Sequence, residues 1–147
     1  MLQSYSQRDP RWADLKLGDS QLTVGRYGCT VTCIADLSTY FGDNFTPMQV
    51  VSLIHFFQGL VLWATCKFPR FHFERREYIR NDINIKAALA DPNGAVMLQV
   101  ANRSHWVVAT GWDDINKVFK IADPWLGDRS DMRRYKNSIT GAAYFKR

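Results

Sequence analysis

The pattern of hydrophobic and polar positions changes its period near the middle of the chain. Between residues 29 and 57 apolar side chains recur at helical spacing, whereas from residue 95 onward they form short runs rich in β-branched and aromatic residues. Helices that precede an antiparallel sheet are typical of an α+β domain, because a parallel sheet needs helices that alternate with strands. The pattern therefore predicts an α+β fold in which N-terminal helices pack on an antiparallel β-sheet.

Three helices are predicted, and each has an end signal in the sequence. Gly42 begins a turn that stops the first helix, Thr46-Pro47 supplies the N-cap and first turn of the second, and Asn81 can cap the third. Gly59 would end the second helix shortly after Phe57. The expected helices span residues 29–41, 47–57 and 83–90.

Four strands are predicted in the second half, over residues 95–100, 105–112, 118–122 and 142–145. Residues 113–117 are rich in turn formers, so the two strands that flank them should form a hairpin. A hairpin brings the end of its second strand beside the start of its first, which places Asp123 next to His105. Residues 1–28 contain frequent breakers and are expected to be irregular.

Residues 50–66 are the most apolar stretch of the chain. Polar residues interrupt it, and it falls short of the roughly 18 apolar residues that a membrane-spanning helix needs. We expect a buried helix followed by a strand or loop, and no stable membrane insertion. The next segment, 60–78, is rich in aromatic and basic residues that would line a cleft or cover the core.

Length and composition favour one compact unit. A chain of 147 residues is too short for two independent cores and a linker, and 46% hydrophobic residues are enough to fold it. We therefore expect a single domain over residues 1–147, and we expect it to be a monomer. The net charge of +5 points to an anionic partner, and residues 129–147 hold six Lys or Arg against one acid, which predicts a cationic rim.

The three cysteines do not form a disulfide framework by count or spacing. Cys29, Cys33 and Cys66 cannot all pair within one chain, and a bond between the first two would close only a tiny loop. The N-terminus has neither the basic start nor the apolar stretch of a secretory signal, so synthesis in a reducing cytoplasm is expected. A zinc site of these cysteines with His72 is an alternative, but no CxxC pair supports it.

The candidate chemistry is a cysteine at a helix start, a histidine at a strand start and an acid at the end of the next strand. A helix N-terminus favours the thiolate form of a cysteine, and Cys29 occupies that position after Gly28. His105 could act as general base and acid, and Asp123 could fix its tautomer. Each residue also has a structural reading: a cysteine is often a small buried hydrophobe, and an Asp-Pro pair after a strand is often a turn.

Five segments in order carry a resemblance to a known family. These segments are Ser6-Gln7-Arg8-Asp9 with Trp12, Leu17-Gly18, Gly25-Arg26-Tyr27-Gly28-Cys29, Ser104-His105-Trp106 continuing to Asp113, and Ile121-Ala122-Asp123-Pro124-Trp125. Together they resemble the papain-like cysteine peptidases related to bacteriocin-processing, double-glycine-type enzymes, over residues 5 to about 128.

The resemblance implies a papain-like fold and a set of four catalytic residues. It implies Cys29 as nucleophile, His105 as base, Asp123 as orienting acid, and Gln7 as the side-chain donor of an oxyanion hole. The chain departs from the family pattern at Cys33, where the family often has a small or hydroxyl residue, and at Thr30-Val31-Thr32, which replaces a stretch that contains Gly-Pro. These departures concern substrate fit more than the catalytic set.

The resemblance predicts a hydrolase of peptide or related amide bonds. Small basic hydrolases without a signal resemble phage endolysins, so the expected substrate is the peptide part of bacterial peptidoglycan, and the expected place of action is the cell wall. The alternatives are a protein- or leader-processing peptidase, an acyl transferase with the same triad, and a basic binding module without catalysis. No stacking motif for nucleic acid is recognisable, so no nucleic-acid partner is expected.

We expect no cofactor and no obligatory metal. Two acidic stretches supply hard oxygen ligands, but neither has the spacing of a known calcium loop, and turn formation explains both. These stretches are Asp113-Asp114-Ile115-Asn116 and Asp128-Arg129-Ser130-Asp131.

Overall fold

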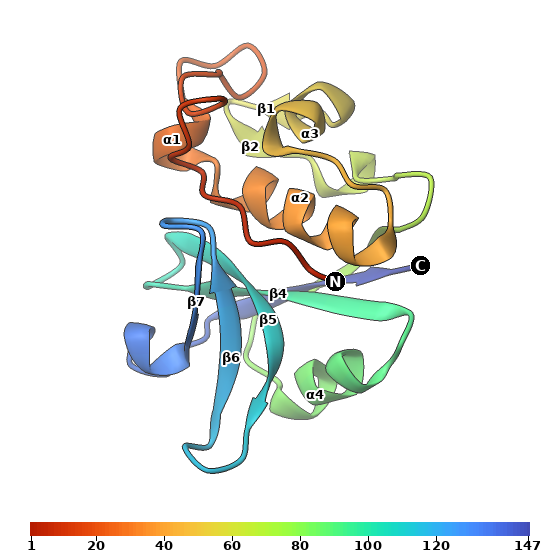
Figure 1. Ribbon diagram of the computed structural model, residues 1–147, viewed down its shortest axis with the longest axis vertical. Helices are drawn as coiled ribbons and strands as arrows, with labels where there is room; N and C mark the ends of the chain where they lie inside the picture. Colours follow the sequence, from red (N-terminus) through yellow and green to blue (C-terminus); the bar gives the residue numbers. More distant parts are fainter.

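A six-stranded antiparallel sheet with helices on both faces forms the centre of the molecule (Figure 1). The computed structural model describes all of residues 1–147 and confirms the α+β class. The strand order is β3-β8-β4-β5-β6-β7. The strands span His72–Glu77 (β3), Gly94–Val100 (β4), His105–Asp113 (β5), Val118–Asp123 (β6), Asp128–Asp131 (β7) and Gly141–Lys146 (β8).

The helices divide between the two faces of this sheet. Helix α2 and the short helices beside it cover one face, and α4 covers the other (Figure 1). The core accordingly has two buried clusters, one between α2 and the sheet and one between α4 and the sheet. The helices span Val24–Tyr27 (α1), Cys29–Phe41 (α2), Pro47–Leu53 (α3) and Asp82–Ala90 (α4).

Helix α2 begins and ends where the sequence predicts. Its C-cap, Gly42, has φ 98°, a left-handed conformation that glycine adopts without steric cost, and its N–H donates to the carbonyl of Ser38. Side chains on nearly every side of the helix are buried, so α2 is an interior helix rather than a surface one. The predicted start of α4 is also confirmed, because the Asn81 side chain accepts from the backbone N–H of Asn84.

The prediction that the second helix reaches Phe57 is wrong. Helix α3 ends at Leu53, and Phe56–Phe57 (β1) pairs with Leu60–Val61 (β2) in a two-stranded hairpin. Gln58 and Gly59 have φ values of 52° and 81°, so both adopt the left-handed conformation of a tight hairpin turn. Gly59 therefore lies in the turn of a hairpin and does not end a helix.

The four predicted strands are confirmed as β4, β5, β6 and β8, and two further strands of the six-stranded sheet were not predicted. These are β3 and β7, which form the two edges of the sheet and consist mainly of polar residues. Edge strands tolerate charged side chains on both faces, which removes the alternation that identifies an inner strand. The β5–β6 connection at residues 113–117 is a hairpin, as expected.

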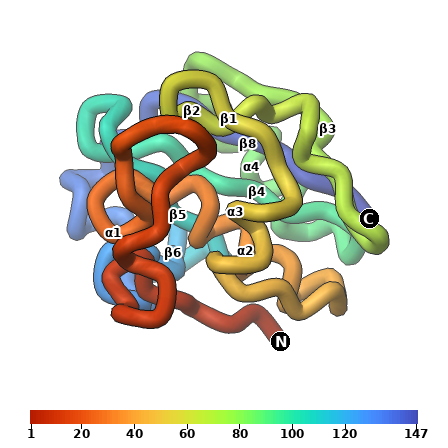
Figure 2. The backbone as a smooth tube through the Cα atoms, turned by 90° about the horizontal axis from the view of Figure 1, so that it is seen from above, coloured from red at the N-terminus to blue at the C-terminus, as the bar shows by residue number.

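The N-terminal segment is irregular apart from the single turn α1, and it packs against the β1–β2 hairpin. Figure 2 shows the two segments side by side above α2. A bridge between Lys16 and Thr23 closes the N-terminal loop, and Leu22 lies directly against Gly59 of the hairpin. No helix in the structure combines the length and apolar character needed to cross a bilayer.

Candidate active site

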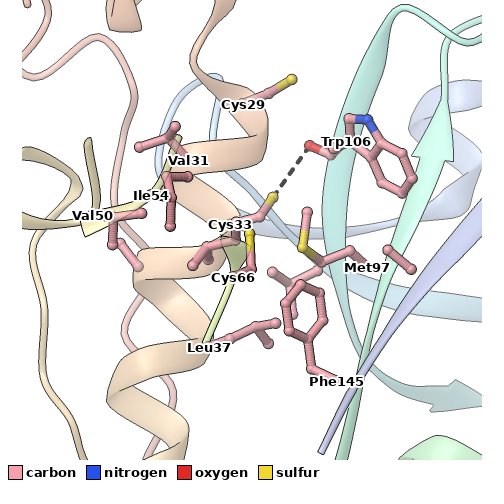
Figure 3. Close-up of a cluster of buried hydrophobic side chains, with 14 of the residues drawn as sticks. Cys29, Val31, Cys33, Leu37, Val50, Ile54, Cys66, Met97, Trp106 and Phe145 are labelled. Carbon is pink, nitrogen blue, oxygen red and sulfur yellow. Dashed lines mark hydrogen bonds between the residues drawn. The ribbon is translucent and has the colours of Figure 1, made fainter. Parts of the chain in front are cut away.

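Cys29 is the first residue of helix α2 and lines a groove of about 700 Å³. Its side chain is 9% exposed, and its sulfur points away from Cys33 and Cys66 (Figure 3). The preceding residue must be small, because a Cβ on Gly28 would lie 2.5 Å from the carbonyl oxygen of Val24. The close contact between α1 and the start of α2 thus fixes where the thiol emerges into the groove.

His105 and Asp123 meet as the hairpin predicts. Strand β5 begins at His105 and β6 ends at Asp123, and pairing of Val108 with Ala122 sets the register between them. The Nε2 atom of His105 lies 2.8 Å from Oδ1 of Asp123. The imidazole lines the same groove as Cys29, so the structure brings the three predicted residues to one place.

The His105 and Asp123 pair is ionised at neutral pH. Burial lowers the pKa of His105, but its contacts with Asp123 and with the Cys29 side chain outweigh burial and raise this pKa to about 9. Burial alone would raise the pKa of Asp123, yet hydrogen bonds from His105 and Tyr135 hold it well below its ordinary value. A protonated imidazole in this position can donate its proton to a leaving group.

Gln7 is buried at the edge of the same groove. Its backbone N–H donates to the carbonyl of Pro124 at 2.7 Å, which ties the N-terminal segment to the loop after Asp123. Its side-chain nitrogen lies 3.5 Å from the carbonyl oxygen of Val24 and 3.3 Å from that of Gly25, and its side-chain oxygen has no partner. An oxyanion-hole role requires one of the two amide N–H groups to face the substrate.

Two residues that sequence reasoning missed hold the second oxygen of Asp123. The Tyr135 hydroxyl donates to Oδ2, and Nη1 of Arg134 donates to the same oxygen at 3.0 Å. Arg134 also forms a bidentate contact with Asp128, and the Trp125 N–H donates to Oδ1 at 3.1 Å. Arg134 and Tyr135 belong to the 3₁₀ turn Met132–Tyr135, which follows strand β7. Because β7 was not predicted, nothing in the sequence indicated where these two side chains lie.

Cys33 and Cys66 are core residues, as the structural reading of a cysteine predicts. Both are fully buried (Figure 3). Burial raises the pKa of Cys33 well above its ordinary value and that of Cys66 to about 12. The Cys33 thiol donates to the carbonyl of Trp106 at 3.4 Å.

The alternative metal sites do not assemble. The structure contains no group of three or more His, Cys, Asp or Glu side chains that could hold a metal ion. His72 is exposed on the edge strand β3, whereas Cys33 and Cys66 lie in the core. Asp113 accepts from the backbone N–H groups of Ile115 and Asn116, which is the turn chemistry expected there.

The lining of the groove is cationic and aromatic. Besides His105, its charged residues are three arginines, and no Asp or Glu lines it. The segment 60–78 contributes to this wall, while other aromatic residues of the same segment pack in the core. The arginines are Arg26, Arg76 and Arg103. The aromatic residues are Tyr27, Trp63, Trp106, Trp125 and Tyr135. The segment 60–78 supplies Trp63 and Arg76 of these, together with Leu60 and Val61.

Three of the six basic residues behind the predicted cationic rim at residues 129–147 lie beside carboxylates. Arg133 pairs with Asp131, Arg134 pairs with Asp128 and Asp123, and Lys146 lies near Glu74 and Asp91. The other three, Arg129, Lys136 and Arg147, form no salt bridge, so the cationic rim stays a prediction. The positive charge of the groove comes from other arginines.

Comparison with known proteins found no family model and no curated protein that matches the chain.

Proposed function

We propose that the protein is a cysteine-dependent amide hydrolase with a papain-like fold and catalytic arrangement. The observation that carries the proposal is the position of His105, which lies in the Cys29 groove with Nε2 held by the buried carboxylate of Asp123. This contact leaves Nδ1 of the imidazole for exchange of a proton with the thiol or substrate. A nucleophile, a base and an orienting group in this order form the triad of cysteine hydrolases.

In the first half of the reaction, the sulfur of Cys29 attacks the carbonyl carbon of the scissile amide. The carbonyl oxygen becomes negative, and the backbone N–H of Cys29, which has no partner within its own helix, can donate to it. Gln7 is the second proposed donor. His105 then gives its proton to the leaving amine, the C–N bond breaks, and a thioester to Cys29 remains.

In the second half, water hydrolyses this thioester. His105, now neutral, takes a proton from the water as its oxygen attacks the thioester carbonyl. The C–S bond breaks, and the products are a carboxylic acid and the regenerated Cys29. Asp123 stays ionised throughout and stabilises the imidazolium at each stage.

The proposed substrate is the peptide part of bacterial peptidoglycan, cleaved in the manner of an endolysin. The groove is lined by aromatic side chains and three arginines and contains no carboxylate, which favours an anionic peptide. Peptidoglycan stem peptides carry free carboxylates and lie exposed in a polymer, so a groove of this charge suits them.

Zymography on purified cell walls tests both parts of the proposal. Wild-type protein and the Cys33→Ala variant should clear the wall, whereas Cys29→Ala and His105→Ala should lose more than about a thousandfold of the activity. Cys33 is the matched control because it is a thiol one helical turn from Cys29 but fully buried.

Two outcomes would change the assignment. Full clearing by Cys29→Ala would remove Cys29 as nucleophile. Intact walls together with turnover of an unstructured protein would favour the protein-processing peptidase over the endolysin.

A further inference from the structure

Arg76 is a half-buried guanidinium on the wall of the groove, and it has no carboxylate partner. Strand β3 places it opposite Ala143 of β8, on the sheet face that carries Trp106. Its Nη2 donates to Oε1 of Gln99 at 3.0 Å, but its Nε is buried and has no partner. Arg76 takes part in none of the salt bridges of the structure, whereas Arg80 and Arg134 each bind a carboxylate.

Aromatic rings hold the Arg76 guanidinium in place. It lies 4.3 Å from the ring centre of Tyr78 and 4.8 Å from that of Trp106, and the Trp63 ring is 5.9 Å away. Gln99 fixes one end of the planar group by its hydrogen bond. A side chain restrained in this way loses little freedom when a ligand binds, so its position is prepared for a partner.

The missing partner is an anion. Arg76 forms no salt bridge and its buried Nε has no partner, so no group of the chain neutralises its charge. Burial also lowers the pKa of Arg76. A guanidinium offers a planar fork of donors that matches a carboxylate. No Asp or Glu lines the groove, so the partner must come from outside the chain.

We propose that Arg76 is a carboxylate-binding subsite of the groove and selects peptides that carry a free carboxylate near the bond presented to Cys29. That Arg76 binds a carboxylate is argued from the surroundings of its side chain alone. That this binding selects peptides for cleavage at Cys29 rests on the proposed function. The subsite consists of Arg76, Gln99 and the rings of Trp63 and Trp106, all of which line the groove.

Binding to the inactive Cys29→Ala protein tests the subsite without turnover. The probe is the tetrapeptide acetyl-L-Ala-γ-D-Glu-L-Lys-D-Ala, prepared with both carboxylates free, with either one amidated, and with both amidated. Isothermal titration calorimetry should show that amidation of one of the two carboxylates weakens binding about tenfold, the size expected for loss of a charge-assisted hydrogen bond.

The Arg76→Gln change in the same background should abolish this difference between acid and amide. Arg75→Gln is the matched control, because Arg75 is the neighbouring residue on β3 but pairs with Glu74 and stacks on Tyr144 outside the groove. It should leave the tenfold preference intact. Thermal unfolding of both variants checks that they fold, and Gln99→Leu, which keeps the arginine but removes its anchor, should reduce the preference.

The possible results separate the subsite from the hydrolase. Equal binding of all four peptides, no binding of the diacid, or a preference that survives Arg76→Gln would overturn the subsite. Binding of the acid through Arg76, with no cleavage of this peptide or of cell walls by wild-type protein, would instead support the subsite and count against the proposed function.

Discussion

At the scale of single residues, the hydrogen bonds to Asp123 determine how firmly the His105 imidazole is held. Both oxygens of this buried carboxylate are occupied, Oδ1 by His105 and the Trp125 N–H, and Oδ2 by Tyr135 and Arg134. A buried charge with all its lone pairs satisfied stays ionised and stays in one orientation. The two residues on Oδ2 are therefore positioning residues for the proposed triad.

Tyr135→Phe removes one donor from Asp123 without changing the shape of the side chain. We expect the free energy of unfolding at pH 7 to fall by about 1–3 kcal/mol, because a buried carboxylate loses a hydrogen bond. Hydrolysis should also fall, since the imidazole is less firmly oriented. Chemical denaturation and initial rates on cell walls measure the two effects.

The pH dependence of this change follows from the depressed pKa of Asp123. A carboxylate whose folded-state pKa is lowered stabilises the fold above its ordinary value of 3.8 and loses that stabilisation as the pH falls through the folded-state value. The stability difference should thus be constant near neutrality and shrink only below pH 3.8. Tyr144→Phe, which loses a bond to Glu77 outside the groove, should lower stability but not activity. Equal activity losses in both variants would contradict the positioning role.

At the scale of elements, the contact between α1 and α2 sets the position of Cys29, the proposed nucleophile. Gly28→Ala would place a methyl group against the Val24 backbone, so the start of α2 must shift. We expect a loss of about 1–3 kcal/mol, the usual range for overpacking, and a marked loss of hydrolysis. Gly111→Ala is the control, because its new methyl group would meet only the Lys120 side chain at 3.8 Å. Thermal unfolding and alkylation of Cys29 by iodoacetamide measure the outcome, and unchanged values for Gly28→Ala would contradict it.

The elements that the sequence predicts are those with local signals. Helix α2 has breakers at both ends, and the β5–β6 hairpin has a turn-rich connection, so the adjacency of His105 and Asp123 could be derived before the structure was known. The β1–β2 hairpin was missed because Gln58-Gly59 follows an apolar helical pattern and acts through backbone conformation. Strands β3 and β7 were missed because edge strands need no alternation.

The part of the site that the sequence did not predict depends on these missed elements. Arg76 lies on β3, and the turn with Arg134 and Tyr135 follows β7. Their contacts join residues that are far apart in the chain, so they produce no periodic pattern in the sequence. The proximity of Cys29, His105 and Asp123 could be predicted, whereas the residues that support Asp123 and line the groove could not.

At the scale of the whole molecule, the three thiols differ in access. Iodoacetamide should label Cys29 alone in the folded protein, because Cys29 lines the groove while Cys33 and Cys66 are fully buried. In denaturant all three should react. Mass spectrometry of the intact protein and of its peptides measures the count and the position of the label. Labelling of Cys33 before global unfolding would contradict this arrangement of the core.

The groove draws on both ends of the chain. The Gln7 N–H reaches the carbonyl of Pro124, and the turn that supports Asp123 lies at residues 132–135. A nascent polypeptide thus cannot hold Asp123 in its final hydrogen bonds until residues 132–135 have been synthesised and have docked against the sheet. For the proposed hydrolase, activity would therefore begin only after this part of the chain has folded.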